Sequence, residues 1–245
     1  MSKVITQKGD CLELMKGIAD KSIDMILCDL PYGTTKNRWD SVIDLSLLWK
    51  QYERIIKDNG AIVLFSQMPF TAELVNSNLK HFRYEWIWEK TTATGFLNAR
   101  KMPLKAHENI LVFYKKLPIY NPQKTVGHKP VNKFTKNTSD GSCYGKTQLG
   151  ITGGGNTDRY PRSILKQKTD KQILSLHPTQ KPVTLLEYFI KTYTNEGDMV
   201  LDNCMGSGST GVACINTHRN FIGIELDTTY YDIAVKRLKE VKDNG

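Results

Sequence analysis

Short apolar runs separated by helical patterns are the feature that most constrains the fold of this chain. The runs have the length and β-branched content of buried strands, and they span Lys3–Gln7, Ile23–Cys28, Ala61–Phe65, Tyr84–Trp88, Asn109–Tyr114, Met199–Leu201 and Phe221–Leu226. Apolar residues recur at helical spacing over Leu45–Lys57, Pro182–Tyr193 and Thr228–Val241. This alternation predicts an α/β fold, a doubly wound and mostly parallel sheet with helices on both faces.

The loop after Met199–Leu201 is the first candidate site, because such sheets bind ligands at the carboxyl ends of their strands. It runs from Asp202 to Thr210 and contains Gly206 and Gly208, which permit a tight turn and a close approach of the backbone to a ligand. Glu225 ends the next apolar run, where a carboxylate can accept two hydrogen bonds from ribose hydroxyls. No Gly-Lys-Ser/Thr follows the glycines, which excludes a P-loop.

The tetrapeptide Asp29-Leu30-Pro31-Tyr32 is the second candidate site and follows the run Ile23–Cys28. Pro31 holds Leu30 in an extended conformation. The Asp29 carboxylate and the Leu30 carbonyl can then act as two adjacent acceptors, which suits the two donors of an exocyclic amino group. Tyr32 can stack on a planar ring. The tetrapeptide therefore predicts a site for a flat substrate that carries an amino group.

The positive charge of the chain is concentrated in one segment. The net charge is +9, and residues 115–182 hold 13 Lys and Arg against 3 Asp and Glu. The remainder holds 21 basic and 22 acidic residues. The basic segment is also the least periodic part of the chain. Such one-sided charge favours a polyanionic partner, nucleic acid before a membrane surface, with contacts between lysines and phosphates that weaken in salt.

Several classes of protein are excluded by the composition. No apolar run approaches the roughly 18 to 20 residues of a membrane-spanning helix, and the N-terminus lacks the apolar segment of a secretory signal. The five cysteines form no Cys-x-x-Cys pair and stand at positions 11, 28, 143, 204 and 214, so neither a zinc site nor a disulfide framework is expected. Reduced thiols indicate a cytoplasmic protein, with no membrane partner and no metal.

Taken in order, these motifs resemble those of the amino-methylating DNA methyltransferases, which transfer a methyl group from S-adenosylmethionine to adenine N6 or cytosine N4. Asp-x-Pro-Tyr comes first, then the basic segment, then the glycine loop, which is the order of the β group of that family. Further matches are Gly9-Asp10, Trp88-Glu89-Lys90, residues 95–108 and residues 177–182. The resemblance implies a Rossmann-like methyltransferase fold with a basic target-recognition insert.

The resemblance also implies roles for individual residues. The catalytic residues would be Asp29, Leu30, Pro31 and Tyr32. S-adenosylmethionine would be bound by Asp10, Lys181, Asp202, Cys204, Gly206, Gly208, Ser209 and Glu225. DNA would be contacted by Lys90 and Asn98 in the matching strand and loop, and by Lys129, Lys133, Lys136, Arg159 and Arg162 in the basic segment. Residues 1–116 would form the catalytic half, 117–176 the target-recognition insert and 177–245 the cofactor-binding half.

Two positions depart from the family pattern. Leu30 replaces a second proline, which keeps the backbone acceptor. Asn203-Cys204 replaces Pro-Phe, which removes an aromatic ring near the cofactor.

The expected mechanism is alignment of a flipped base. Asp29 and the Leu30 carbonyl would hold the amino group, Tyr32 would stack on the base, and proton loss would follow methyl transfer, because an ordinary aspartate with a pKa near 3.9 is a weak base. In the family, an Asp at position 29 usually accompanies adenine, so adenine N6 in duplex DNA is the expected target.

Other functions stay open from the sequence. They are cytosine-N4 methylation, an inactive DNA-binding homologue, methylation of RNA or protein, and a nicotinamide-dependent oxidoreductase, which would leave Asp29 to Tyr32 without a role. The family allows a homodimer and a cognate restriction endonuclease as partners. A bacterial or phage-encoded protein of the cytoplasm is expected.

Overall fold

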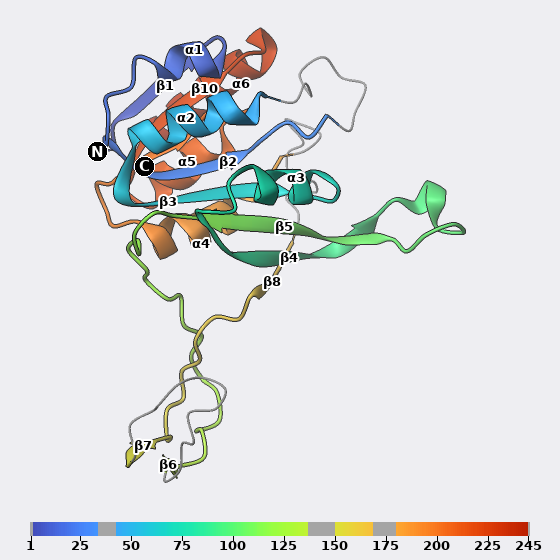
Figure 1. The fold of residues 1–245 in the computed structure, drawn as a ribbon, viewed down its shortest axis with the longest axis vertical. Coiled ribbons are helices and arrows are strands. Elements are labelled where there is room, and N and C mark those ends of the chain that lie inside the picture. The colour runs from blue at the N-terminus through green and yellow to red at the C-terminus, as the bar shows by residue number, and fades with distance from the viewer. Residues whose placement is uncertain (1, 34–42, 137–149, 169–179, 245) are drawn as a thin grey trace. The chain divides into compact units, whose positions relative to one another are not determined.

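The computed structural model describes residues 2–33, 43–136, 150–168 and 180–244. The chain divides into two compact units (Figure 1). The large unit comprises Met1–Asn121 and Ser163–Gly245, and the small unit comprises Pro122–Arg162. Among the described residues, no helix is long and apolar enough to cross a membrane.

An eight-stranded sheet forms the centre of the large unit, in the order β1-β10-β9-β2-β3-β5-β4-β8. β5 pairs antiparallel with β3 and with β4, and the other pairings are parallel. The strands are β1 (Val4–Lys8), β2 (Ile23–Asp29), β3 (Ile56–Ser66), β4 (Phe82–Thr94), β5 (Lys105–Phe113), β8 (Ile164–Gln167), β9 (Met199–Asp202) and β10 (Asn220–Glu225). The predicted doubly wound and mostly parallel sheet is confirmed.

Helices cover both faces of this sheet. They are α1 (Cys11–Met15), α2 (Leu45–Ile55), α3 (Phe70–Ser77), α4 (Val183–Tyr193), α5 (Ser209–Asn216) and α6 (Thr228–Asn244), with a short 3-10 helix η1 (Phe96–Asn98). One buried cluster joins the sheet to α4, α5 and α6, and a second joins it to α1, α2 and α3. Within β2, Met25 and Leu27 belong to the first cluster, and Ile26 and Cys28 to the second. This alternation is the period of two that a strand buried on both faces requires.

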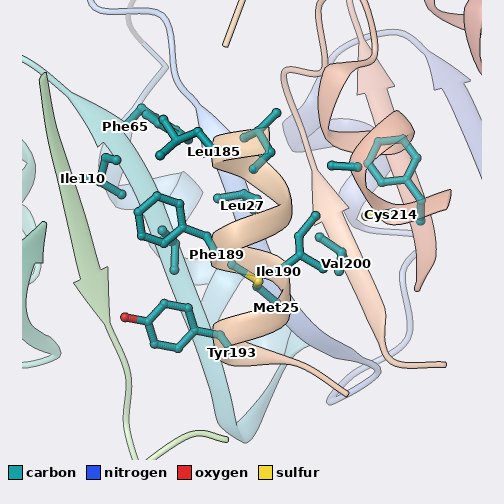
Figure 2. Close-up of a cluster of buried hydrophobic side chains, with 14 of the residues drawn as sticks. Met25, Leu27, Phe65, Ile110, Leu185, Phe189, Ile190, Tyr193, Val200 and Cys214 are labelled. Atoms are coloured by element: carbon teal, nitrogen blue, oxygen red, sulfur yellow. The ribbon is translucent and has the colours of Figure 1, made fainter. Parts of the chain in front are cut away.

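Helix α4 shows how these contacts are made. Leu185, Phe189, Ile190 and Tyr193 recur at helical spacing and point from one face of α4 onto the strands (Figure 2). All four are buried. The helix begins at Val183, directly after Pro182, and a proline at the start of a helix loses no hydrogen bond.

The predicted helix Leu45–Lys57 was two residues too long. The structure ends α2 at Ile55, and Ile56 has the extended angles φ −71° and ψ 139°. Ile56 pairs with Ile23 of β2, so tertiary pairing of the backbone overrides the helical pattern there. The start of α2 follows from its sequence, because Asp44 accepts hydrogen bonds from the backbone N–H groups of Ser46 and Leu47.

The small unit contains an antiparallel pair of short strands, β6 (Phe134–Lys136) and β7 (Ile151–Gly153). A bridge between Thr125 and Arg159 joins the two chain segments that flank this pair. The small unit contains fewer residues than the predicted insert 117–176, because β8 within that range pairs with β4 in the main sheet.

Candidate active site

The carboxyl ends of four strands meet on one edge of the sheet. β10 lies between β1 and β9, and β9 pairs with β2. Backbone hydrogen bonds join the loops beyond the strands, from the Gly9 N–H to the Glu225 carbonyl at 2.9 Å and from the Met205 N–H to the Ile224 carbonyl at 2.9 Å. Residues that lie far apart in the sequence therefore form one site.

The glycine loop needs glycine for its conformation. Gly206 has φ +51° and Gly208 has φ +78°, which is the left-handed region that other residues rarely adopt. A Cβ on Gly208 would also lie 3.1 Å from the Cβ of Ala234. The Gly206 N–H donates to Glu225 Oε2 at 2.8 Å, so the loop and the end of β10 hold each other in place.

Asp202 and Arg237 also brace this loop. The Asp202 carboxylate accepts hydrogen bonds from the Thr210 hydroxyl at 2.6 Å and from the Cys204 N–H at 3.1 Å. Arg237 of α6 donates to the Ser209 hydroxyl at 3.0 Å and to the Ser207 carbonyl at 3.2 Å. The sequence motifs did not reveal Arg237, because α6 lies outside all of them.

Glu225 has the chemistry to accept a ribose. Its Oε1 and Oε2 each accept one backbone N–H at 2.8 Å, and a carboxylate has further lone pairs on both oxygens. Burial raises the pKa of this carboxyl group. Asp10 caps α1 by accepting the N–H groups of Leu12 and Glu13. Carboxylate acceptors beside a glycine loop fit the hydroxyl and amino donors of an adenosyl group.

Cys204 lies in a polar cluster where the family usually has an aromatic ring. The Asn203 amide contacts the Cys204 sulfur at 3.5 Å and the Cys11 sulfur at 3.6 Å. The Tyr52 hydroxyl donates to the Asn203 carbonyl oxygen. In the described part of the chain, no three His, Cys, Asp or Glu side chains are grouped to hold a metal ion. Asn203 thereby links the glycine loop to Tyr52 of α2 and to Cys11 of α1.

Asp29 is the last residue of β2 and lies at the same sheet edge. Its Oδ1 accepts the Tyr32 hydroxyl at 2.6 Å, and its Oδ2 pairs with Lys181 Nζ at 2.6 Å. The side chain keeps 24% of its surface exposed, so a substrate can still reach it. The Tyr32 ring packs against Phe70, with ring centres 5.3 Å apart.

Lys181 continues into a second ion pair. Its Nζ lies 3.1 Å from Glu108 Oε2, and Glu108 Oε1 pairs with Lys90. Burial acts to raise the pKa of Glu108, but the two lysines outweigh it and leave the pKa lowered. The pKa of Asp29 is raised by burial, against the opposing charge of Lys181. The pKa of Lys181 is raised because its two carboxylates outweigh its burial.

Two predicted positions therefore have different surroundings from those expected. Lys181 was predicted at the cofactor, and its ammonium group pairs with Asp29 and Glu108. Lys90 was predicted at DNA, and its ammonium group pairs with Glu108 and lies over the Trp88 ring at 5.0 Å. Glu108 itself, absent from the predicted site residues, links the two. A sequence signal existed, because Glu108 closes the matching stretch 95–108.

The other predicted DNA contacts lie in three settings. Asn98 ends η1 in the connection between β4 and β5, and these two strands extend together as an arm (Figure 1). Lys129, Lys133 and Arg162 are exposed in the small unit, and Lys136 ends β6. Arg159 instead donates to the carbonyls of Asn156, Asp158 and Lys129, so it braces the loops of the small unit. His177, Pro178 and Thr179 lie outside the described residues.

Comparison with protein families identifies this arrangement. The family model described as DNA methylase, for N6 and N4 methyltransferases, matches residues 23–236. The chain belongs to the amino-methylating DNA methyltransferases. The predicted family and its cofactor, S-adenosylmethionine, are thereby confirmed.

Curated relatives of this methyltransferase match over most of its length. It is 29% identical to the type II methyltransferase M.HinfI of Haemophilus influenzae, over 97% of this chain and 68% of the relative. It is also 29% identical to the DNA adenine methyltransferase YhdJ of Escherichia coli strain K12, over 94% of this chain and 81% of the relative.

Solved structures share the fold of this methyltransferase. The complex of M1.HpyAVI with S-adenosylmethionine matches with a TM-score of 0.66 and 25% identity, over 96% of this chain and 98% of the other. The cytosine-N4-specific PvuII methyltransferase matches with a TM-score of 0.69 and 16% identity, over 100% and 93%. The chain therefore shares its Rossmann-like fold with both structures, one of which is named as cytosine-N4-specific.

Proposed function

We propose that this methyltransferase transfers a methyl group to N6 of adenine in duplex DNA, at a specific sequence, after the base has flipped out of the helix. The observation that carries the proposal is the Asp29 carboxylate. It lies at the carboxyl end of β2, remains partly exposed, and is followed by Pro31 and Tyr32. The similarity to YhdJ, a DNA adenine methyltransferase, supports adenine as the base.

The chemistry proposed for the protein is alignment and charge stabilisation. Asp29 and the Leu30 carbonyl would accept the two N–H groups of the adenine amino group, which aims the nitrogen lone pair away from the ring plane. Positive charge then develops on that nitrogen, and the fixed carboxylate stabilises it. S-adenosylmethionine supplies the electrophilic methyl group when bound. Tyr32 already packs on Phe70, and we infer that its other face meets the flipped base.

We infer that Glu225, Asp10, Gly206, Gly208 and Ser209 hold the cofactor. Glu225 would accept the ribose hydroxyls, because it ends β10 beside the glycine loop. Asp202 and Cys204 would act indirectly, since Asp202 fixes the loop through Thr210 and Cys204.

We infer that DNA contacts the exposed basic residues of the small unit and the arm around Asn98. Near Asn98, the side chains of Phe96 and Leu97 are also exposed, and residues 90–107 contain four Lys and Arg and no acidic residue. Phosphates suit the lysines and arginines. A homodimer, a cognate restriction endonuclease and a cytoplasmic location in a bacterium remain predictions that follow from the family and from the bacterial relatives.

Sequencing of modified DNA tests the proposed function. The protein is expressed in a host that lacks adenine methylation, and long-read sequencing reports each modified base with its context. We expect N6-methyladenine within one sequence motif. N4-methylcytosine as the only mark would overturn the choice of base. Intact S-adenosylmethionine binding without any mark would indicate an inactive homologue.

Replacement of Asp29 tests the residue that carries the proposal. Asp29→Ala should lower the rate of methyl transfer by about 10²- to 10³-fold, because the charge that stabilises the amino nitrogen is lost. S-adenosylmethionine affinity, measured by calorimetry, should stay unchanged. Turnover at the wild-type rate would contradict the assignment.

A further inference from the structure

We propose that Lys181 is a positioning residue that keeps Asp29 in its negatively charged form, in which the carboxylate accepts hydrogen bonds. Glu108 and Lys90 set the strength of this effect of Lys181. The proposal rests on the proposed function only in taking Asp29 as the group that meets the substrate. It departs from the expected role of Lys181 at the cofactor.

Four side chains from separate parts of the fold form a chain of alternating charge. Lys90 comes from β4, Glu108 from β5, Lys181 from the residues before α4 and Asp29 from the end of β2. The successive contacts are Lys90 to Glu108, Glu108 to Lys181 at 3.1 Å, and Lys181 to Asp29 at 2.6 Å. The two positive and two negative groups balance, which is the condition for burying charges at acceptable cost.

Lys181 lies between the two carboxylates of this row of charges, and its side chain is the least exposed of the four. Its side chain is 8% exposed. Its Nζ lies between two carboxylates and over the rings of Phe65 at 5.2 Å and Tyr32 at 5.9 Å. An exposed lysine ammonium group is a mobile point charge on a flexible side chain. These contacts hold the ammonium group of Lys181 in one position beside Asp29.

Asp29 needs such a partner because of its surroundings. Burial opposes its negative charge, and the negative charge of Glu108 opposes it further. The Tyr32 hydroxyl donates to it, and Cys28 and Asp202 interact with it from β2 and β9. Only Lys181 among these groups brings a positive charge. Without it, a buried carboxylate takes up a proton at higher pH, and a protonated carboxyl group donates where the adenine amino group needs an acceptor.

Two substitutions should therefore shift the pKa of Asp29 in opposite directions. Lys181→Met removes the positive charge and leaves Glu108 beside Asp29, so the pKa of Asp29 rises. Glu108→Gln removes the like charge and leaves Lys181 to pair with Asp29 alone, so the pKa of Asp29 falls. Lys181→Arg keeps the charge and should largely restore the behaviour of the wild type. A role in packing alone predicts no such reversal of sign.

The test measures single-turnover methyl transfer against pH, with DNA and S-adenosylmethionine saturating. In Lys181→Met we expect the acidic limb of the profile to move up by about one to three pH units, the effect of one opposite charge at this range. In Glu108→Gln the limb should move down. Calorimetry should give cofactor affinities for both variants within about twofold of the wild type, far below the tenfold change that one unit of pKa represents. Thermal unfolding verifies that each variant is folded.

A second readout does not depend on activity. Infrared difference spectra follow the carbonyl stretch of protonated Asp29 through a pH titration, and Asp29→Asn identifies the band by its loss. The band should titrate at higher pH in Lys181→Met and at lower pH in Glu108→Gln. Such shifts would support the proposal even if the enzyme methylated a base other than adenine.

Three outcomes would overturn the proposal. The first is that neither the acidic limb of the pH profile nor the infrared band of Asp29 moves in Lys181→Met. The second is movement in the same direction in both variants. The third is normal transfer at saturating cofactor with a large loss of cofactor affinity, which would return Lys181 to the role expected from the sequence.

Discussion

Three central strands each end in a carboxylate, and the partners of each carboxylate decide its role. Asp29 at the end of β2 meets an ammonium group. Asp202 at the end of β9 meets a hydroxyl and a backbone N–H within the chain. Glu225 at the end of β10 meets two backbone N–H groups. The same functional group at one edge of a sheet can thus have three roles, because its hydrogen-bond partners differ. They are the proposed alignment of the substrate by Asp29, the bracing of the glycine loop by Asp202 and the proposed binding of the cofactor by Glu225.

Asp202 should make stability depend on pH. Burial raises the pKa of Asp202 to about 6, above its value in the unfolded chain. The folded state therefore binds the proton more tightly, and the free energy of unfolding should fall as pH rises through about 4 to 6, by up to about 3 kcal/mol. Urea unfolding across this range should show a smaller fall in Asp202→Asn than in the wild type, because Asp202 no longer contributes to it.

Asp58 offers a control of opposite sign. Lys21 and Lys116 hydrogen-bond to this surface carboxylate and lower its pKa to about 2. Its contribution to stability is present above the pKa of the unfolded chain and is lost as pH falls toward 2. Asp58→Asn should therefore leave the difference between pH 4 and 6 intact. If it removed that difference, the assignment to Asp202 would be wrong.

At the scale of elements, α4 joins the core to the proposed site. Its first residue follows Lys181 and Pro182. Its apolar face lies beside Phe65 (Figure 2), in a cluster that also contains Trp86. Phe65 also lies under the Lys181 ammonium group. The packing of α4 therefore fixes where the polypeptide before it can place Lys181.

Phe189→Ala should destabilise the fold through α4. Phe189 is fully buried, and its ring lies 5.8 Å from that of Trp86 and 6.4 Å from that of Phe65. Loss of the ring leaves a cavity, which should lower the free energy of unfolding by about 3–5 kcal/mol. Leu47→Ala on α2 is the matched control, because Leu47 is 50% exposed. Equal losses in urea unfolding would show that the cluster does not carry the stability.

At the scale of the whole molecule, the basic excess and the proposed active site lie in different units of the chain. The small unit, residues 122–162, holds 7 Lys and Arg against 2 Asp. The carboxylates at the sheet edge and their partners belong to the large unit. Such an excess of positive charge on one unit suits the binding of phosphates.

Salt should reveal the basic unit as a phosphate-binding surface. Lys129→Ala with Lys133→Ala should reduce the slope of log affinity against log salt by up to about 2, because each phosphate contact contributes about 0.9. Fluorescence anisotropy with labelled duplex DNA measures the slope. Lys239→Ala, an exposed lysine of α6, should leave it unchanged. If Lys239→Ala reduced the slope equally, the change would reflect the net charge of the protein and not contacts made by Lys129 and Lys133.

Much of the fold and part of the site could be predicted from local patterns. Strand β2 was predicted because all residues of Ile23–Cys28 except Asp24 are apolar. The glycine loop was predicted because Gly206 and Gly208 mark a turn that few residues adopt. The helix end at Ile55 was missed, since pairing of Ile56 with Ile23 decides it. The strand β8 was also missed, because four residues in a polar segment become a strand only beside β4.

Local patterns in the sequence predicted most strands of the main sheet, the helices α2, α4 and α6, the turn chemistry of the glycine loop and the acid at the end of β2. Period, glycine and proline act over a few residues, so they can be read locally. The carboxylate partners of Lys181 and Lys90 could not be predicted in this way, because ion pairing depends on atoms a few ångströms apart. Those partners come from distant parts of the chain, and the sheet brings them together.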